Sequence, residues 1–207
     1  MKHEKDYFQE IAAIRSMMER TSKFLSLSGW AGIMAGIYAL IGAYLAYGLF
    51  HVNADGLIVT PVLEDQSNAL LKLAALALAT LFLALVTAIL LSYKKANKRG
   101  EKLWNATAKR LLIDLAVPLV TGGLLILLLI SKGFIGLAAP FTLIFYGLAL
   151  YNAGKFTYGA VRALGLLEVG LGLISVYFTD YGLLFWAFGF GLLHIVYGIY
   201  IHYRYER

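Results

Sequence analysis

Six long apolar runs constrain the fold of this chain more than any other feature of its sequence. Each run is long enough, at roughly 1.5 Å per residue, to cross a hydrocarbon core about 30 Å thick as an α-helix. Hydrophobic residues make up 60% of the chain and charged residues only 14%, which excludes an ordinary soluble fold. The sequence therefore predicts an all-α integral membrane protein with six transmembrane helices, over residues 24–50, 69–93, 111–131, 134–153, 158–178 and 182–203.

The N-terminal residues differ in character from the rest of the chain. Within residues 1–23, Phe8, Ile11 and Met18 recur at helical spacing, while Glu10 and Glu19 fall elsewhere on the helix. This pattern predicts a cytoplasmic amphipathic helix that lies on the membrane surface or under the bundle, with a partner-binding helix as the alternative. Residues 24–207 are then expected to form a single six-helix transmembrane domain.

The basic residues are distributed unevenly between the two sides of the predicted membrane. Of the 18 Lys and Arg residues, only Lys72 and Lys132 fall on the side opposite the termini. The excess of positive charge on cytoplasmic loops predicts that the N-terminus and the C-terminus both lie in the cytoplasm. The pI near 9.4 is thus explained by topology and by contact with lipid headgroups, and no nucleic-acid partner is expected.

The second half of the chain repeats itself at a period near fifty residues. The stretch "GLLILLLISKG" at 123–133 has the glycine spacing of "GLISVYFTDYG" at 172–182. Further on, "IFYGLALY" at 144–151 matches "IVYGIYIH" at 195–202, which places Tyr146-Gly147 over Tyr197-Gly198. Such a repeat predicts three tandem helical hairpins that pack in parallel orientation.

The last hairpin, "GLGLISVYFTDYGLLFWAFGFGLLHIVYGIYIHYRYER", resembles the units of uncharacterised small six-helix bacterial inner-membrane proteins. Among these, the nearest named family is the acid-resistance membrane protein family. The turn of the last hairpin in this chain, Thr179-Asp180-Tyr181-Gly182, lacks the proline that is common in that family. The resemblance implies a multi-pass protein of the bacterial inner (plasma) membrane, and it supplies no catalytic residues.

Small residues mark the helix faces that are expected to pack closely. Lipid tails are as apolar as the helices, so close backbone approach and dispersion hold transmembrane helices together. The predicted packing positions in the first, fifth and sixth spans are Gly32, Gly36, Gly165, Gly172, Gly191 and Gly198.

A carboxyl group and an imidazole lie deep in the last two predicted spans. Glu168 shares a helical face with Gly165 and Gly172, and His194 shares one with Gly191 and Gly198. We expect these two glycine-lined faces to meet, with Glu168 and His194 between them as a buried polar pair. A lone carboxylate at this depth costs at least about 2.5 kcal/mol, which favours pairing. The pair is expected to act as a hydrogen-bonded clamp or as a proton-coupled or ligand-binding site; the remaining alternative is that the two residues face other helices.

Asp114 and Arg162 form a second candidate pair. Each lies a few residues inside the cytoplasmic end of its predicted span. We expect an ion pair between them on the cytoplasmic side, either as a structural salt bridge or with a gating or anion-binding role.

The sequence argues against intramembrane catalysis. The chain has no cysteine, which excludes disulfides, thiolate metal sites and cysteine nucleophiles, and it has no HExxH motif. Ser175 and His194 are expected to differ in depth by roughly 13 Å, too far for a serine nucleophile and its base. We therefore expect no catalytic residue, no metal and no cofactor.

Two hypotheses for function remain. The first is a small transporter, a solute-binding protein or a proton-linked sensor that uses Glu168 and His194. The second is a non-catalytic structural, assembly or stress-response bundle that acts through a partner. The lipid bilayer is the expected surrounding in both, with a small-molecule ligand in the first or a protein partner in the second, and self-association stays open.

Overall fold

The computed structural model describes residues 28–49, 66–98, 100 and 104–206, and all regular structure in these ranges is helical. The prediction of six apolar helices long enough to span a membrane is confirmed. The first three are α2 (Gly29–Leu49), α3 (Gln66–Lys98) and α4 (Ala106–Ser131). The predicted amphipathic segment 1–23 and the start of the first predicted span lie outside the described residues.

The last three spans include short irregular turns. The fourth begins with the 3₁₀ turn η1 (Ile135–Leu137) and continues as α5 (Ala138–Ala153), and the fifth is α6 (Gly159–Tyr177). The sixth starts with the 3₁₀ turn η2 (Thr179–Tyr181) and runs on through α7, η3, α8 and η4. Their bounds are α7 Gly182–Trp186, η3 Ala187–Leu193, α8 His194–Ile201 and η4 His202–Glu206, and both η3 and η4 are π-helical.

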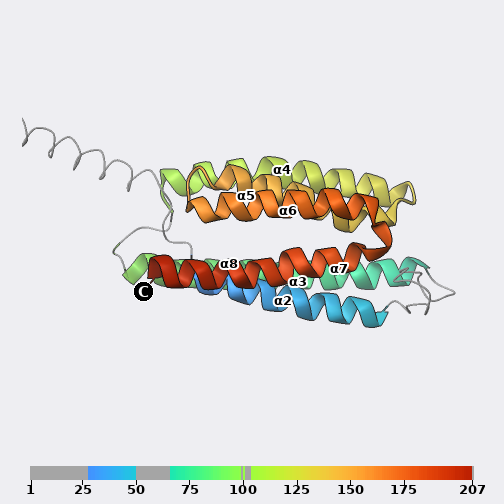
Figure 1. Cartoon of the computed structure of the whole chain (residues 1–207), viewed down its shortest axis with the longest axis horizontal. Helices are drawn as coiled ribbons and strands as arrows, with labels where there is room; N and C mark the ends of the chain where they lie inside the picture. Colours follow the sequence, from blue (N-terminus) through green and yellow to red (C-terminus); the bar gives the residue numbers. More distant parts are fainter. Residues whose placement is uncertain (1–27, 50–65, 99, 101–103, 207) are drawn as a thin grey trace, which may run out of the picture.

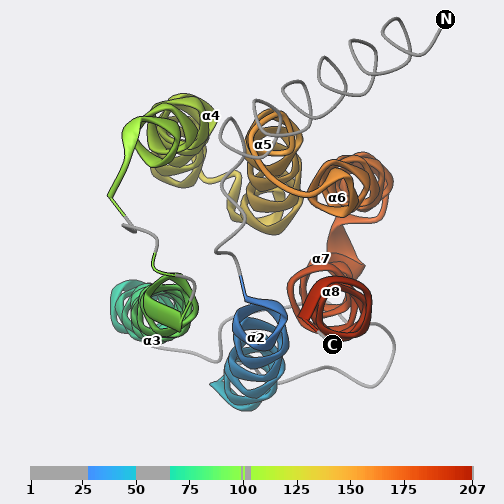
Figure 2. The ribbon, with the colours of Figure 1, turned by 90° about the vertical axis from the view of Figure 1, so that its left-hand side faces the viewer.

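The helices form two groups of three that lie side by side (Figures 1 and 2). In one group α5 lies between α4 and α6, and in the other α2 lies between α3 and α8. The connection from α6 to α7 joins the α4–α5–α6 group to the α2–α3–α8 group at one end of the bundle. This arrangement departs from the pairing of neighbours along the chain at one helix, because α8 packs mainly on α2 and little on α6.

The outward surface of the bundle is apolar. No residue of the most apolar stretch of α3 is buried, and only 6% of that of α4 is. Large side chains such as Leu71, Phe82 and Leu127 are each at least 65% exposed. An apolar surface of this extent would drive aggregation in water, so it indicates contact with lipid. The chain is a multi-pass helical membrane protein.

Glycine lets two pairs of helices pack backbone to backbone in the same way. A Cβ added at Gly147 of α5 would lie 2.6 Å from the carbonyl oxygen of Gly165 and 2.8 Å from the amide nitrogen of Val169, both on α6. A Cβ added at Gly198 of α8 would lie 2.5 Å from the carbonyl oxygen of Gly29 and 2.6 Å from the amide nitrogen of Ile33, both on α2. The α5–α6 and α8–α2 contacts therefore use the same atoms at the same spacing.

These contacts correct the expectation that the glycine faces of the fifth and sixth spans meet each other. Gly172 of α6 lies against Pro140 and Ile144 of α5, whereas Gly191 of the sixth span lies against Leu40 and the carbonyl oxygen of Gly36 on α2. The physical reason is that α5 and α2 carry glycines of their own, so two bare backbones approach each other in each pair. Gly32 also faces the sixth span, since a Cβ added at Gly32 would lie 3.2 Å from the Cα atom of Gly198.

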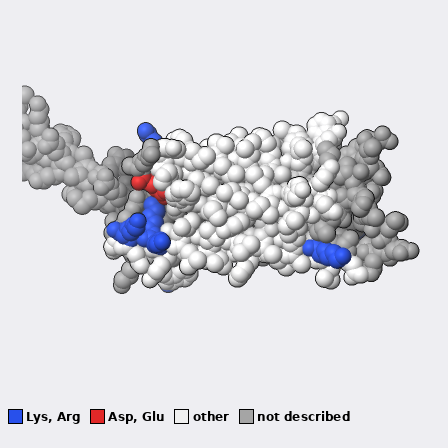
Figure 3. Space-filling model, turned by 90° about the horizontal axis from the view of Figure 1, so that it is seen from below, with Lys and Arg blue, Asp and Glu red and all other residues white. Residues whose placement is uncertain are grey.

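Charge is concentrated at one end of the bundle. We call this the basic end; α3 and α5 finish there, and α4 and α6 begin there. Figure 3 shows most of the Lys and Arg side chains of one face gathered at one end. Lys95 and Lys98 lie in the last turn of α3, and Lys109 lies in the first turn of α4. The charge pattern read from the sequence is thus kept in the fold.

Candidate functional site

Glu168 lies in the interior of the bundle without a hydrogen-bond partner. Its side chain is 0% exposed, and neither carboxyl oxygen has a partner within the described part of the chain. The backbone of the sixth span lies directly against it, since a Cβ added at Gly189 would be 2.5 Å from Glu168 Oε2 and 2.6 Å from Leu143 Cδ2. Only glycine at position 189 leaves room for the carboxyl group in this conformation.

His194 is held by two hydrogen bonds that fix its tautomer. Its Nδ1 atom lies 3.0 Å from the carbonyl oxygen of Gly189, and its Nε2 atom lies 2.8 Å from the hydroxyl oxygen of Tyr146 on α5. A carbonyl oxygen only accepts, so Nδ1 carries the hydrogen and donates it. Nε2 then accepts the hydroxyl hydrogen of Tyr146. Both ring nitrogens are satisfied with the imidazole neutral.

The predicted pair is brought together, but at a distance longer than a hydrogen bond. His194 Nδ1 lies 3.4 Å from Glu168 Oε1, and the His194 side chain is 6% exposed. Because the Nδ1 hydrogen is already directed to Gly189, the carboxyl group is left beside the imidazole without a donor of its own. The contact is close enough for a proton or a charge on one group to be felt by the other.

A π-helical turn places His194 in this position. The segment η3 (Ala187–Leu193) immediately precedes His194, and the side chain reaches back five residues to the carbonyl oxygen of Gly189. A π turn adds a residue and rotates the later part of the helix. The His194 carbonyl oxygen still faces Gly32 of α2, but its side chain points to Tyr146 of α5. Single π turns of this kind are frequent at functional sites.

Aromatic rings enclose the imidazole. The Phe190 ring stacks on His194 with centroids 5.9 Å apart and an interplanar angle of 15°, and the Tyr146 ring lies 4.8 Å from Phe190. Trp186 packs against Phe190 in turn, at 4.9 Å. These ring contacts restrict the orientation of the imidazole.

The structure does not form the predicted ion pair between Asp114 and Arg162, both of which it describes. The Arg162 guanidinium instead donates to the Tyr151 hydroxyl and lies over the Tyr151 ring, 4.3 Å from its centroid. The reason is the order of the helices, because α5 lies between α4, which carries Asp114, and α6, which carries Arg162.

Several residues at or near the site were not predicted from the sequence to belong to it. Tyr146 and Gly189 complete the surroundings of His194 and Glu168, and the buried hydroxyl oxygens of Ser175 and Tyr197 have no partner within the described residues. The repeat that aligns Tyr146-Gly147 with Tyr197-Gly198 was a usable signal for both tyrosines. No sequence pattern pointed to Gly189, whose role depends on the π turn.

Comparison of the chain with models of known protein families, with curated proteins and with solved structures finds no match. The chemistry of the site is therefore the basis for assigning a function. That chemistry consists of a fully buried carboxyl group, a neutral imidazole 3.4 Å away and a tyrosine hydroxyl bonded to the imidazole, with residues drawn from three helices.

Proposed function

We propose that the chain is a small proton-linked transport protein in which Glu168 and His194 together bind one proton. The observation that carries the proposal is the Glu168 carboxyl group, which is fully buried and accepts no hydrogen bond in the described residues. A charged carboxylate in these surroundings costs at least about 2.5 kcal/mol, whereas the neutral acid avoids that cost. The resting site is expected to hold Glu168 as the neutral acid.

The neighbouring imidazole gives the proton a second place. When His194 takes a proton at Nε2, the Tyr146 hydroxyl turns from donor to acceptor, and the ring becomes an imidazolium. A carboxylate at Glu168 then lies 3.4 Å from the positive ring, which compensates its charge. The pair therefore binds one proton in either of two arrangements, and the fully deprotonated site is the costly state that a bound cation or a conformational change would relieve.

The alternative hypothesis, a non-catalytic bundle, is favoured by the complete burial of Glu168. A structural clamp, however, gains its stability from hydrogen bonds. Here both His194 nitrogens bond to other groups, and both Glu168 oxygens stay unsatisfied in the described part of the chain. A closed, proton-occupied site accounts for the burial and for the missing bonds together.

The orientation and the cellular membrane belong to the same proposal. The excess of Lys and Arg at the basic end supports a cytoplasmic basic end, and hence a cytoplasmic N-terminus and C-terminus. The matching α5–α6 and α8–α2 contacts support an origin in three tandem hairpins. A bacterial inner membrane rests on the resemblance of the last hairpin alone.

Infrared spectroscopy tests the proton site without knowledge of the transported solute. In lipid vesicles, the purified protein is expected to show a protonated-carboxyl band that disappears as the pH is raised. Glu168→Gln should abolish this band, whereas Ser175→Ala, two turns further along the same helix, should keep it. If the band survives in Glu168→Gln, or if the wild-type protein shows none at any pH at which it is folded, the proposal is refuted.

A further inference from the structure

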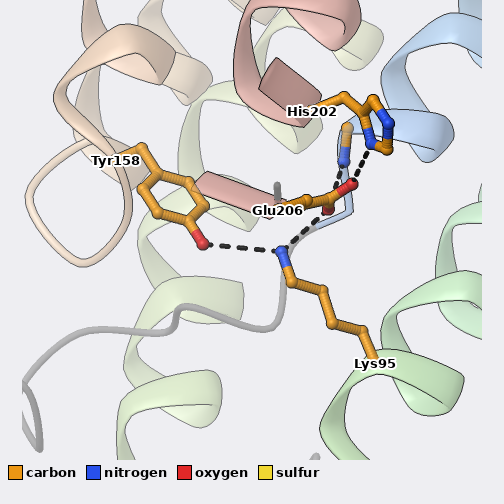
Figure 4. Close-up of polar contacts among 5 residues, drawn as sticks. Lys95, Tyr158, His202 and Glu206 are labelled. Carbon is orange, nitrogen blue, oxygen red and sulfur yellow. Dashed lines mark hydrogen bonds and ion pairs between the residues drawn. The ribbon is translucent and has the colours of Figure 1, made fainter. Parts of the chain in front are cut away.

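A second polar cluster joins helix ends at the basic end of the bundle (Figure 4). The Glu206 carboxylate accepts a hydrogen bond from the Gly29 amide at the start of α2, 2.9 Å away, and another from Lys95 Nζ of α3, also 2.9 Å away. Its second oxygen lies 2.8 Å from His202 Nδ1. One carboxylate near the C-terminus thus holds the ends of α2, α3 and the sixth span together.

The cluster also reaches across to the other group of helices. Lys95 Nζ lies 3.5 Å from the hydroxyl oxygen of Tyr158, the residue immediately before α6, and 5.6 Å from the centre of its ring. The Tyr205 ring packs on Tyr158 with centroids 4.3 Å apart. Tyr158 therefore contacts Lys95 and Tyr205, both of which belong to the α2–α3–α8 group and its C-terminal extension. Glu206 holds the lysine in place, since the two side chains are only 13% and 11% exposed.

Tyr158 of this polar cluster is itself packed in a layer of buried apolar side chains, on the side toward the Glu168 site. The layer contains Ala153 of α5, Val161 of α6 and Ile201 of α8, packed with Ala108 and Leu111 of α4. Val161 precedes Glu168 by seven residues and Ile201 follows His194 by seven, so the layer lies roughly 10 Å from the site along both helices. Along α6 and the sixth span, this layer lies between the basic end and the Glu168 site.

The close backbone-to-backbone glycine contacts do not join the two groups of helices. Gly165 and Gly172 of α6 pack on the backbone of α5, and Gly198 of the sixth span packs on the backbone of α2. Gly189 does face the other group, but there it meets the side chains of Glu168 and Leu143. Side-chain contacts hold one group to the other, and those around Tyr158 lie at the basic end. Breaking them would let the apolar layer part while both glycine contacts stay intact.

We propose that Glu206, Lys95 and Tyr158 form a gate that closes the basic end over the Glu168 site. This inference rests on the proposed function, since a gate implies a site that exchanges with that side of the membrane. In the closed state Glu206 neutralises Lys95 and holds it against Tyr158. Loss of the Glu206 charge removes this restraint on Lys95, weakens the contacts of Tyr158 with the C-terminal segment, and lets water reach the apolar layer.

Cysteine accessibility tests the gate directly, because the natural chain contains no cysteine. Ala153→Cys places a reporter in the apolar layer at a position that is 3% exposed, and Ser175→Cys places one in the opposite half of α6 at a position that is 0% exposed. Each reporter is labelled in micelles with a small water-soluble methanethiosulfonate. Glu206→Gln is expected to raise the labelling rate of Ala153→Cys about tenfold, which corresponds to losing one charge-assisted hydrogen bond.

Matched variants separate a gate from a general structural clamp. Arg204→Gln, which also removes a charge from the same C-terminal segment, should leave both labelling rates unchanged, and Glu206→Gln should leave the Ser175→Cys rate unchanged. Should Glu206→Gln not fold, Lys95→Gln replaces it with the same expectation. Equal increases at both reporters, or no increase at Ala153→Cys, overturn the proposal. Labelling measures access alone, so the gate and the proton site can fail independently.

Discussion

Replacing Gly165 by Ala should destabilise the bundle through the α5–α6 contact. An added Cβ would lie 2.6 Å from the carbonyl oxygen of Gly147 and 2.7 Å from the amide nitrogen of Tyr151. Both atoms belong to the backbone, so no side chain can rotate away. Restoring ordinary contact at 3.4 Å requires the helices to separate by about 0.8 Å, which loosens the packing along the whole contact.

The size of the effect is the balance of two opposing contributions. Overpacking of a well-packed interior costs about 1–3 kcal/mol. Replacing Gly by Ala within a helix stabilises the folded protein by about 0.5–1 kcal/mol, because it lowers the entropy of the unfolded chain. Gly170 on the same helix has open space at its Cβ position, so Gly170→Ala gains the second contribution without the first. The difference between the two variants isolates the packing cost, at about 1–3 kcal/mol.

Unfolding in mixed micelles with increasing dodecyl sulfate, followed by circular dichroism, measures both variants under the same conditions. Gly165→Ala should unfold at a lower detergent fraction than the wild-type protein, and Gly170→Ala at the same or a higher one. Gly198→Ala should behave like Gly165→Ala, because its Cβ meets backbone atoms of α2 at 2.5 and 2.6 Å. Equal stability of Gly165→Ala and Gly170→Ala would refute the packing described for α5 and α6.

Two further outcomes test the site and the topology. Tyr146→Phe removes the donor to His194 Nε2 and leaves a buried acceptor unpaired. This should lower the free energy of unfolding by about 1–3 kcal/mol. The control Tyr200→Phe, at a half-exposed position of α8, should change the free energy of unfolding little. In intact cells, a membrane-impermeant maleimide should label a single cysteine at Ser131 but not one at Asn97 near the basic end, and the reverse pattern would contradict a cytoplasmic basic end.

The helices were predictable because their signal lies in consecutive residues. A span needs about 20 apolar residues in a row, and six such runs are visible in the sequence without any knowledge of what each run contacts. The ends of the helices were predicted less closely, since α3 extends to Lys98, five residues past the predicted end of the span at residue 93. Basic residues that snorkel to the membrane surface do not stop a helix, although they end an apolar run.

The helix faces that pack together were not predictable in the same way. Glycine at helical spacing shows that a face permits close approach, but it does not name the partner. Glu168 and His194 do lie near each other, but not because two glycine-lined faces meet. The π turn before His194 turns its side chain away from the Gly191–Gly198 face. A π turn leaves little trace in the sequence, and one added residue changes which helix each later side chain contacts.

The repeated contact also shows that packing alone does not require a carboxyl group at position 168. Gly165 of α6 and Gly29 of α2 occupy matching places in the two glycine contacts, so Glu168, three residues after the first, corresponds to Gly32, three residues after the second. At Gly32 the neighbouring ring of Tyr197 lies 3.3 Å from an added Cβ, and the contact forms without any charge. Because one copy packs with glycine where the other holds a buried acid, the acid serves a purpose other than packing.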